Sequence, residues 1–326
     1  MAINLSTLQP TKISRDLKGK FMLVYGEPKS GKTSLATCFP KSRLVAFEKG
    51  YNALPNIMAI DAPTWVAMKE ILRELKKPDI QNRFDTIIID TASIAWDRCS
   101  EYICQQNQVS DLTEIAWGKG TKACSREFEK VFREITLLGY GLVFLAHAEE
   151  KVPFQGDESQ AYIAPMLDKR PYRIVNGMVD IISCIDVNKE TGERFLQLRS
   201  TPRIVAGCRF KYMPDRIPLD YDELVNSLAE AIEKQGEVSG GMIVDERIDL
   251  GEEDKERPFD EAMDEARKVW TAILEKDDSD AMLERMMQVI EDQFGSRIKL
   301  SQTTPKQQGL LELAILELKD LLATLG

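Results

Sequence analysis

The chain has 326 residues, of which 43% are hydrophobic and 29% charged, an ordinary balance for a globular protein with one large and one small domain. No apolar run approaches the roughly 20 residues that cross a bilayer, and no export signal opens the chain, so we expect a cytoplasmic protein without a membrane segment. Residues 240–326 contain 21 acidic and 11 basic residues, so the whole net charge of −10 lies there. This distribution excludes a uniformly basic nucleic-acid-binding surface.

Strands and helices alternate along the first two thirds of the sequence. Apolar runs predict strands at 20–25, 43–48, 84–90, 141–148, 178–187 and 194–200. Apolar residues at helical spacing predict helices at 31–39, 63–75, 127–138 and 220–235. This order predicts an α/β fold with a mostly parallel twisted sheet and helices on both faces. The turn "NKETGE" joins the last two strands and predicts an antiparallel extension at one edge.

Composition divides the chain into four parts. We expect an N-terminal arm at 1–19, a core domain at 20–236 and an acidic, Gly-rich flexible linker at 237–258. Residues 259–326 contain three stretches of helical periodicity and predict a small helical module.

The stretch "GEPKSGKT" (26–33) follows an apolar strand and precedes a helix, which is the setting of a phosphate-binding loop. Backbone N–H groups of such a loop and of the helix start surround the phosphates. Lys32 is expected to reach the β- and γ-phosphates and Thr33 to ligate Mg²⁺. The nucleotide-binding candidates are Gly26, Glu27, Pro28, Lys29, Ser30, Gly31, Lys32, Thr33 and Ser34.

Two acidic residues end apolar strands. Asp90 closes "DTIIID", where it can hold Mg²⁺, although a strand-end Asp can also simply cap a turn. The next residue is Thr91 and not the glutamate that many ATPases place there. Glu48 closes the second strand and is the candidate catalytic base that orients the attacking water. The alternative is a solvated loop glutamate.

His147 is the only histidine and ends the strand "GLVFLAHA". A lone histidine is often structural. At the carboxyl end of a parallel strand, however, it can contact the γ-phosphate and transmit its presence to the next segment, so we include it among the catalytic candidates with Glu48 and Lys32. "NKET" (188–191) lacks the aspartate two positions after Lys189 that would recognise guanine.

Together these residues resemble the RecA-like recombination ATPases, and most closely the phage-encoded Sak-type single-strand annealing group. The resemblance spans about residues 20–235 and rests on "GEPKSGKT", "AFEKGYNAL", "TIIIDT" and "LVFLAHAEEK". It implies a RecA-like P-loop NTPase core that uses ATP and Mg²⁺, in the host cytoplasm if the chain is phage-encoded. It does not cover the C-terminal helical module.

The resemblance also implies homo-oligomers, either filaments or rings, with ATP at the subunit interface. A neighbouring subunit would then supply basic residues to the γ-phosphate. Arg209 and Lys211 are two apart, so a strand would place them on one face. Arg199 and Arg203 are further candidates, and all four could instead be solvated surface charges.

The family binds single-stranded DNA through two loops, which correspond to residues 97–122 and 149–177. The first contains Trp117, Lys119 and Lys122. The second mixes acids with aromatic residues and with the DNA-binding candidates Lys151, Lys169, Arg170 and Arg173. Cations for phosphates and aromatic rings for bases suit single strands, although a lid without a DNA role fits the same composition.

Three functions stay open at this stage. The first is an ATPase stimulated by single-stranded DNA that promotes phage DNA recombination or strand annealing. The second is a ring-forming, helicase-like motor. The third is an ATP-gated scaffold that recruits a protein partner through its C-terminal module.

Overall fold

The computed structural model describes residues 13–14, 17–52, 54–153, 158–239, 243–244 and 258–325. Two compact units lie within residues 10–249 and 250–326. Most of the expected N-terminal arm and acidic linker falls outside the described residues, as does Phe154 of the expected second DNA loop. In the described part, Ile13–Ser14 (β1) pairs in parallel with Ile243–Val244 (β12).

A mostly parallel sheet organises the first unit. Its order is β11-β9-β8-β2-β6-β5-β3-β4, and the run from β8 to β4 is parallel. β9 and β11 add the expected antiparallel extension. The strands are β2 Phe21–Gly26, β3 Ser42–Ala46, β4 Ala59–Asp61, β5 Thr86–Asp90, β6 Gly141–Lys151, β7 Tyr162–Pro165, β8 Ile181–Val187, β9 Arg194–Gln197, β10 Gly207–Cys208 and β11 Arg216–Pro218. The predicted α/β class is confirmed.

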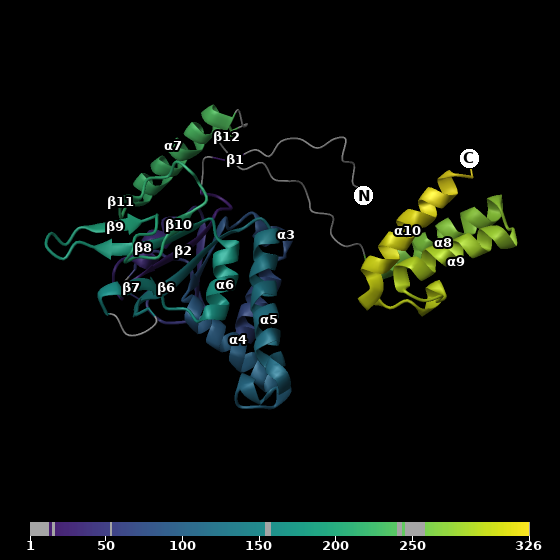
Figure 1. Cartoon of the computed structure of the whole chain (residues 1–326), viewed down its shortest axis with the longest axis horizontal. Helices are drawn as coiled ribbons and strands as arrows, with labels where there is room; N and C mark the ends of the chain where they lie inside the picture. Colours follow the sequence, from purple (N-terminus) through teal and green to yellow (C-terminus); the bar gives the residue numbers. More distant parts are fainter. Residues whose placement is uncertain are drawn as a thin grey trace. The chain divides into compact units, whose positions relative to one another are not determined.

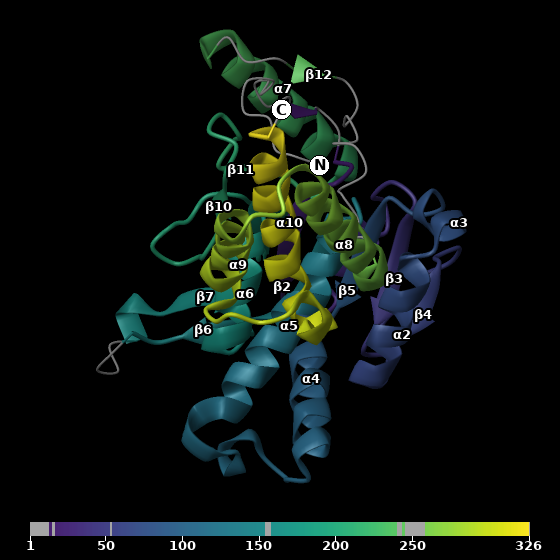
Figure 2. The same cartoon turned by 90° about the vertical axis from the view of Figure 1, so that its right-hand side faces the viewer.

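Helices cover both faces of the sheet (Figures 1 and 2). On one face, α2 (Trp65–Leu75), α4 (Ala92–Asn107), α5 (Lys119–Leu137) and α6 (Lys169–Met178) enclose one apolar core. On the other, α1 (Lys32–Ala36) and α7 (Tyr221–Ser239) enclose a second. All five residues of β5 are buried, as expected for a β-branched strand covered on both sides. A short helix, α3 (Pro78–Gln81), follows α2.

The two segments predicted as DNA-binding loops are largely regular structure, so the loop prediction is wrong for both. Residues 97–122 contain most of α4, two 3₁₀ turns at Leu112–Glu114 and Ala116–Gly118, and the start of α5. In the segment 149–177, β6 runs on to Lys151, pairs with β7, and is followed by α6. The reason is packing: Pro171, Val175 and Met178 bury one side of α6.

Several element bounds also differ from those predicted. The helix expected at 127–138 begins eight residues earlier, at Lys119, and the closing helix continues to Ser239 into the expected linker. The strand expected at 178–187 begins at Ile181, because α6 extends to Met178.

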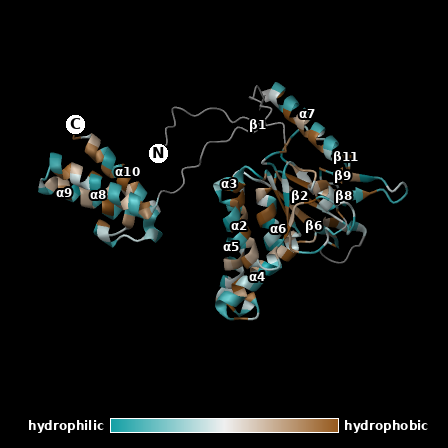
Figure 3. Cartoon of the chain, turned by 180° about the vertical axis from the view of Figure 1, so that it is seen from behind, coloured by the Kyte–Doolittle hydropathy of each residue, from teal (hydrophilic) through white to brown (hydrophobic). Residues whose placement is uncertain are grey.

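The second unit is a helical module, described here by itself. It contains α8 (Phe259–Lys276), α9 (Asp280–Phe294) and α10 (Gln308–Ala323), with 3₁₀ turns at Leu300–Gln302 and Pro305–Gln307. Apolar and polar residues alternate around these helices (Figure 3), and Ile273, Met286 and Leu318 are fully buried. Within the described residues, every helix is too short or too polar to span a membrane.

Candidate nucleotide site

The phosphate loop connects β2 to α1 and depends on two glycines. A Cβ at Gly26 would lie 2.9 Å from the Ser30 hydroxyl oxygen and 3.0 Å from Ile185 Cβ, so only glycine fits there. Gly31 has a φ of 110°, which side chains rarely tolerate. The loop is therefore shaped by its own backbone, as a cradle for phosphates requires.

Lys32 lies inside this loop and is only 6% exposed. Its ammonium group donates to the carbonyl oxygens of Gly26 at 3.0 Å and Glu27 at 2.9 Å. Burial lowers the pKa of Lys32, and the neighbouring Asp90, Glu48 and Glu27 carboxylates oppose that shift. A buried ammonium that has only carbonyl partners gains strongly from an anion, so the loop fits a bound phosphate chain.

Asp90 ends β5 beside this lysine and is 3% exposed. Its Oδ2 accepts a hydrogen bond from Thr33 Oγ1 at 2.9 Å. Burial raises the pKa of Asp90, partly offset by the Thr33 hydrogen bond. A hydroxyl and a carboxylate in contact are oxygen ligands of the kind that Mg²⁺ takes, so these two residues fit a cation beside the phosphates.

Glu48 follows β3 and lies at the same edge of the sheet. The backbone N–H groups of Phe47 and Glu48 donate to the Asp90 carbonyl at 2.7 and 3.3 Å. Glu48 Oε1 lies 3.5 Å from His147 Nε2, and both side chains are about 30% exposed. His147 pairs with Gly26 in the β2–β6 register. The fold thus brings Lys32, Thr33, Asp90, Glu48 and His147 together, because the carboxyl ends of parallel strands share one edge.

The four predicted trans-acting residues are not among the residues that meet at this edge of the sheet. Arg209 and Lys211 do not share the expected strand, because β10 ends at Cys208. Arg209 pairs with Asp180 at 3.1 Å and donates to Gly177 O at 3.0 Å. The Arg199 guanidinium donates to the carbonyls of Cys208, Phe210 and Lys211. Arg199 and Arg209 therefore brace their own subunit. Arg203 and Lys211 are exposed.

Arg194, at the start of β9, is a site residue that sequence patterns did not indicate. Its Nη1 donates to the carbonyl oxygen of Ser30 in the phosphate loop at 3.2 Å. The two residues are 164 positions apart, so only the fold reveals the contact.

Sheet and loop together define a P-loop nucleotide-binding protein. The chain belongs to the AAA domain family, whose model matches residues 18–210, and it is therefore an ATPase. This family implies a bound nucleotide and usually Mg²⁺, and both fit the residues just described.

A relative from Bacillus subtilis (strain 168), the SPbeta prophage-derived uncharacterized protein YorG, is 27% identical over 338 residues, which span 99% of this chain and 100% of the relative. Among solved structures, the RadB recombinase has a TM-score of 0.36 at 14% identity, over 56% of this chain and 80% of that chain. The flagellar accessory protein FlaH from Methanocaldococcus jannaschii has a TM-score of 0.31 at 13% identity, over 56% and 79%.

The arrangement assigns a chemical task to each residue. Lys32 and the loop amides would bind and orient the phosphates, and Thr33 with Asp90 would hold Mg²⁺, which neutralises phosphate charge when bound. The Glu48 side chain is 31% exposed, so its carboxylate can meet a water molecule and accept its proton. His147 lies 3.5 Å from the Glu48 carboxylate and is placed to orient it. These roles of Glu48 and His147 remain predictions.

Proposed function

We propose that this chain is a RecA-like ATPase of phage origin that assembles into oligomers, binds single-stranded DNA and promotes recombination or annealing. The prophage-derived relative, which matches almost end to end, supports the phage origin. The observation that carries DNA binding is a basic groove between α5 and α6.

The basic groove has a volume of about 670 Å³ and is lined by Ser125, Glu129, Arg133, Lys169, Arg170, Arg173, Ile174 and Gly177. Arg133 pairs with Glu129 at 2.7 Å. Among the described residues, Lys169, Arg170 and Arg173 have no carboxylate partner. Three unneutralised cations along one helix suit a phosphate backbone. Lys151, the fourth candidate, pairs with Glu149 at 2.8 Å and contributes less.

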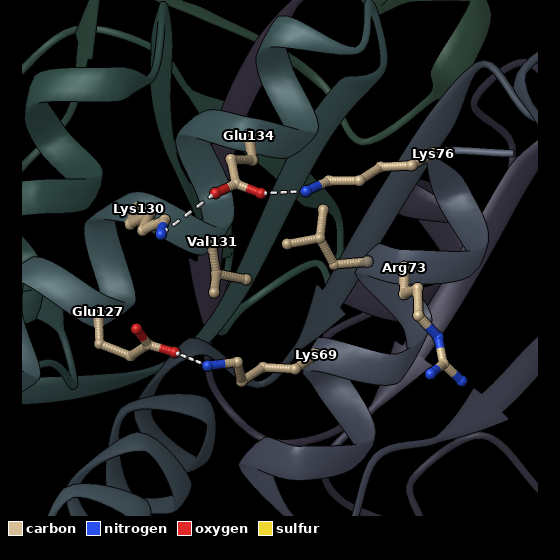
Figure 4. A pocket seen from close by; sticks show the side chains of 8 residues that line it. Lys69, Arg73, Lys76, Glu127, Lys130, Val131 and Glu134 are labelled. Carbon is tan, nitrogen blue, oxygen red and sulfur yellow. Dashed lines mark hydrogen bonds and ion pairs between the residues drawn. The ribbon is translucent and has the colours of Figure 1, made fainter. Parts of the chain in front are cut away.

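The neighbouring surface between α2 and α5 differs in its charge pairing. Figure 4 shows Lys69 facing Glu127, and Lys76 and Lys130 facing Glu134. Each of these three lysines thus has a carboxylate partner in its own chain. Positive charge alone therefore does not distinguish the two surfaces. The α5–α6 groove is favoured as the DNA site because Lys169, Arg170 and Arg173 have no acid partner among the described residues.

Base stacking would come from the end of the α4–α5 hairpin. Trp117 is 96% exposed there, with Lys119 at the start of α5 beside it. An exposed indole next to cations suits unpaired bases more than a closed duplex. Tyr172 packs against the core, so it is a weaker candidate.

A path of direct contacts connects the nucleotide site to the basic groove. The His147 carbonyl accepts a hydrogen bond from Met166 N at 2.8 Å. Two residues later Asp168 precedes α6, which carries Lys169, Arg170 and Arg173. A displacement of His147 on nucleotide binding would thus move the groove, and DNA in the groove would act back on hydrolysis.

The test is ATP hydrolysis by the full chain with and without single-stranded DNA. We expect stimulation of about fivefold or more, the lower end of ordinary allosteric coupling. Lys169→Ala/Arg170→Ala/Arg173→Ala should abolish the stimulation, weaken DNA binding roughly 10- to 100-fold at low salt and reduce the salt slope by about 2.

The matched control is Lys76→Ala/Lys77→Ala/Lys130→Ala, which removes the same charge from paired sites on the other surface. It should leave DNA affinity within about twofold, because general charge is screened. Equal losses in both variants, or no stimulation of the native chain, would contradict DNA binding in the groove.

Oligomerisation is the other part of the proposal. Arg203 and Lys211 are the trans-acting candidates whose guanidinium or ammonium group is not held by a carbonyl or carboxylate of the described chain. Sedimentation with ATP and single-stranded DNA should show assemblies larger than a monomer. A monomer under all conditions would contradict the proposed oligomerisation.

A protein partner at the C-terminal module stays a prediction. Leu310, Leu313 and Leu316 are exposed on α10 of this module.

A further inference from the structure

Arg194 touches the phosphate loop from the antiparallel edge of the sheet. Its Nη1 lies 3.2 Å from the Ser30 carbonyl oxygen. The same nitrogen would lie only 3.1 Å from a Cβ placed on Gly31. The guanidinium therefore rests on the peptide that joins Ser30 to Gly31, against the bare face of the glycine.

The position of Arg194 is fixed by the strands around it. Its backbone pairs with Val187 of β8, and its carbonyl accepts a hydrogen bond from Leu219 N at 2.9 Å, just after β11. Leu219 Cδ2 would lie 3.3 Å from a Cβ on Gly31, so this side chain and the Arg194 guanidinium pack against the same face of the glycine. Strand pairing thus holds the arginine over the loop.

Arg194 also differs in charge pairing from the other arginine at this edge. Arg216 of β11 pairs with Asp186 at 3.0 Å and stacks over the Phe195 ring. In the described part of the chain, Arg194 has no such acid and its recorded partner is the loop carbonyl. Arg194 is thus an exposed cation whose guanidinium contacts the phosphate-binding loop.

The planarity of the peptide bond indicates how the contact between Arg194 and the Ser30 carbonyl affects the loop. A trans peptide is planar, and its C=O and the following N–H point in opposite directions. When Arg194 holds the Ser30 carbonyl toward β9, the Gly31 N–H is held pointing away from β9. The bound cation also polarises this peptide, which makes its N–H a stronger donor.

We propose that Arg194 is a positioning residue for nucleotide binding: it orients and polarises the Ser30–Gly31 peptide of the phosphate loop. The ligand class is a nucleoside di- or triphosphate, because the oriented amide belongs to the loop and not to the γ-phosphate end. This inference depends on the ATPase family assignment and is independent of DNA binding.

The test measures the affinity of the full chain for ADP and for ATPγS by calorimetry, with Mg²⁺ present and DNA absent. Arg194→Ala should weaken both nucleotides equally, by about tenfold, the usual effect of one charge-assisted hydrogen bond. The hydrolysis rate at saturating ATP should stay within about twofold, so the loss appears in KM and not in kcat. Arg194→Lys, which keeps one cationic donor, should recover part of the affinity.

Arg216→Ala is the matched control, and we expect native affinity because its partner is Asp186. If Arg194→Ala does not fold by circular dichroism, Arg194→Gln keeps a neutral donor and serves for the same measurement. Native nucleotide affinity in a folded Arg194→Ala or Arg194→Gln variant would overturn the inference. A lower kcat with unchanged ADP affinity would also overturn it, because Arg194 would then act on the γ-phosphate. If DNA does not stimulate ATP hydrolysis, the proposed DNA-binding function fails, but the inference about Arg194 is unaffected.

Discussion

Glu48→Gln is expected to lower the ATP hydrolysis rate by about 10²- to 10⁴-fold while ATP binding stays close to native. The amide has nearly the same shape but cannot accept a proton from the attacking water. Glu48 is suited to that task by position: its backbone N–H bonds the Asp90 carbonyl, and its carboxylate lies 3.5 Å from His147. Phosphate release at saturating ATP measures the rate, and calorimetry with ATPγS measures binding.

Glu74→Gln is the control for Glu48→Gln. This variant has the same Glu-to-Gln substitution at an exposed position. Glu74 lies at the end of α2 and forms an exposed ion pair with Lys77. We expect its hydrolysis rate to be native, since exposed pairs contribute little. Unchanged hydrolysis in Glu48→Gln would remove Glu48 as the base, and weaker ATPγS binding in that variant would assign it to nucleotide binding instead.

Asp90→Asn is expected to reduce Mg²⁺-dependent hydrolysis by at least about 100-fold, because a metal ion contributes several kcal/mol of charge stabilisation in phosphoryl transfer. Asn keeps an oxygen that can accept the Thr33 hydrogen bond but loses the negative charge. Weaker Mg²⁺ binding should also be visible in a thermal-shift measurement. ADP with Mg²⁺ should raise the melting temperature of the variant by less than that of the native chain.

The pH dependence of Asp90 distinguishes its charge from its shape. Burial raises its pKa above the ordinary 3.8. A raised folded-state pKa contributes stability that is fully present below 3.8 and is lost as the pH rises through the folded value. At neutral pH the ionised carboxylate therefore costs stability in the nucleotide-free chain, and Mg²⁺ relieves that cost.

Two results follow for Asp90→Asn. The nucleotide-free variant should melt at a higher temperature than the native chain at neutral pH, because the buried charge is gone. The native chain should bind Mg²⁺ with ADP more weakly as the pH falls through the raised pKa of Asp90, and the variant should lack this dependence. A lower melting temperature for the folded variant would mean that the longer-range attraction between the Asp90 carboxylate and the Lys32 ammonium outweighs burial.

Local sequence patterns indicated most of the candidate nucleotide site, but not Arg194. The spacing of "GEPKSGKT" identifies a phosphate loop, and apolar runs predict the strands next to Asp90, Glu48 and His147. In the structure Asp90 ends β5, Glu48 follows β3 by two residues, and His147 lies within β6 where β2 ends beside it. Once the strands are parallel, their carboxyl ends must converge, so the proximity of these residues follows from class and order.

The helices around the site were harder to predict. α6, "KRPYRIVNGM", contains a proline and a glycine and buries only Pro171, Val175 and Met178, so its helical pattern is short. α4 begins at Ala92, two residues after Asp90, and mixes Ser, Gln and Asn with its apolar residues. Both form because they cover the sheet, and that packing outweighs weak local propensity.

By itself the sequence determined the α/β class, the phosphate loop and the acids and histidine at the strand ends, because each depends on residues close together in the chain. Only the tertiary structure decided that Lys169, Arg170 and Arg173 share a groove with α5, that Arg199 and Arg209 brace their own subunit, and that Arg194 reaches Ser30. These contacts join distant segments, and their geometry is set by how strands pair and helices pack, which no local pattern records.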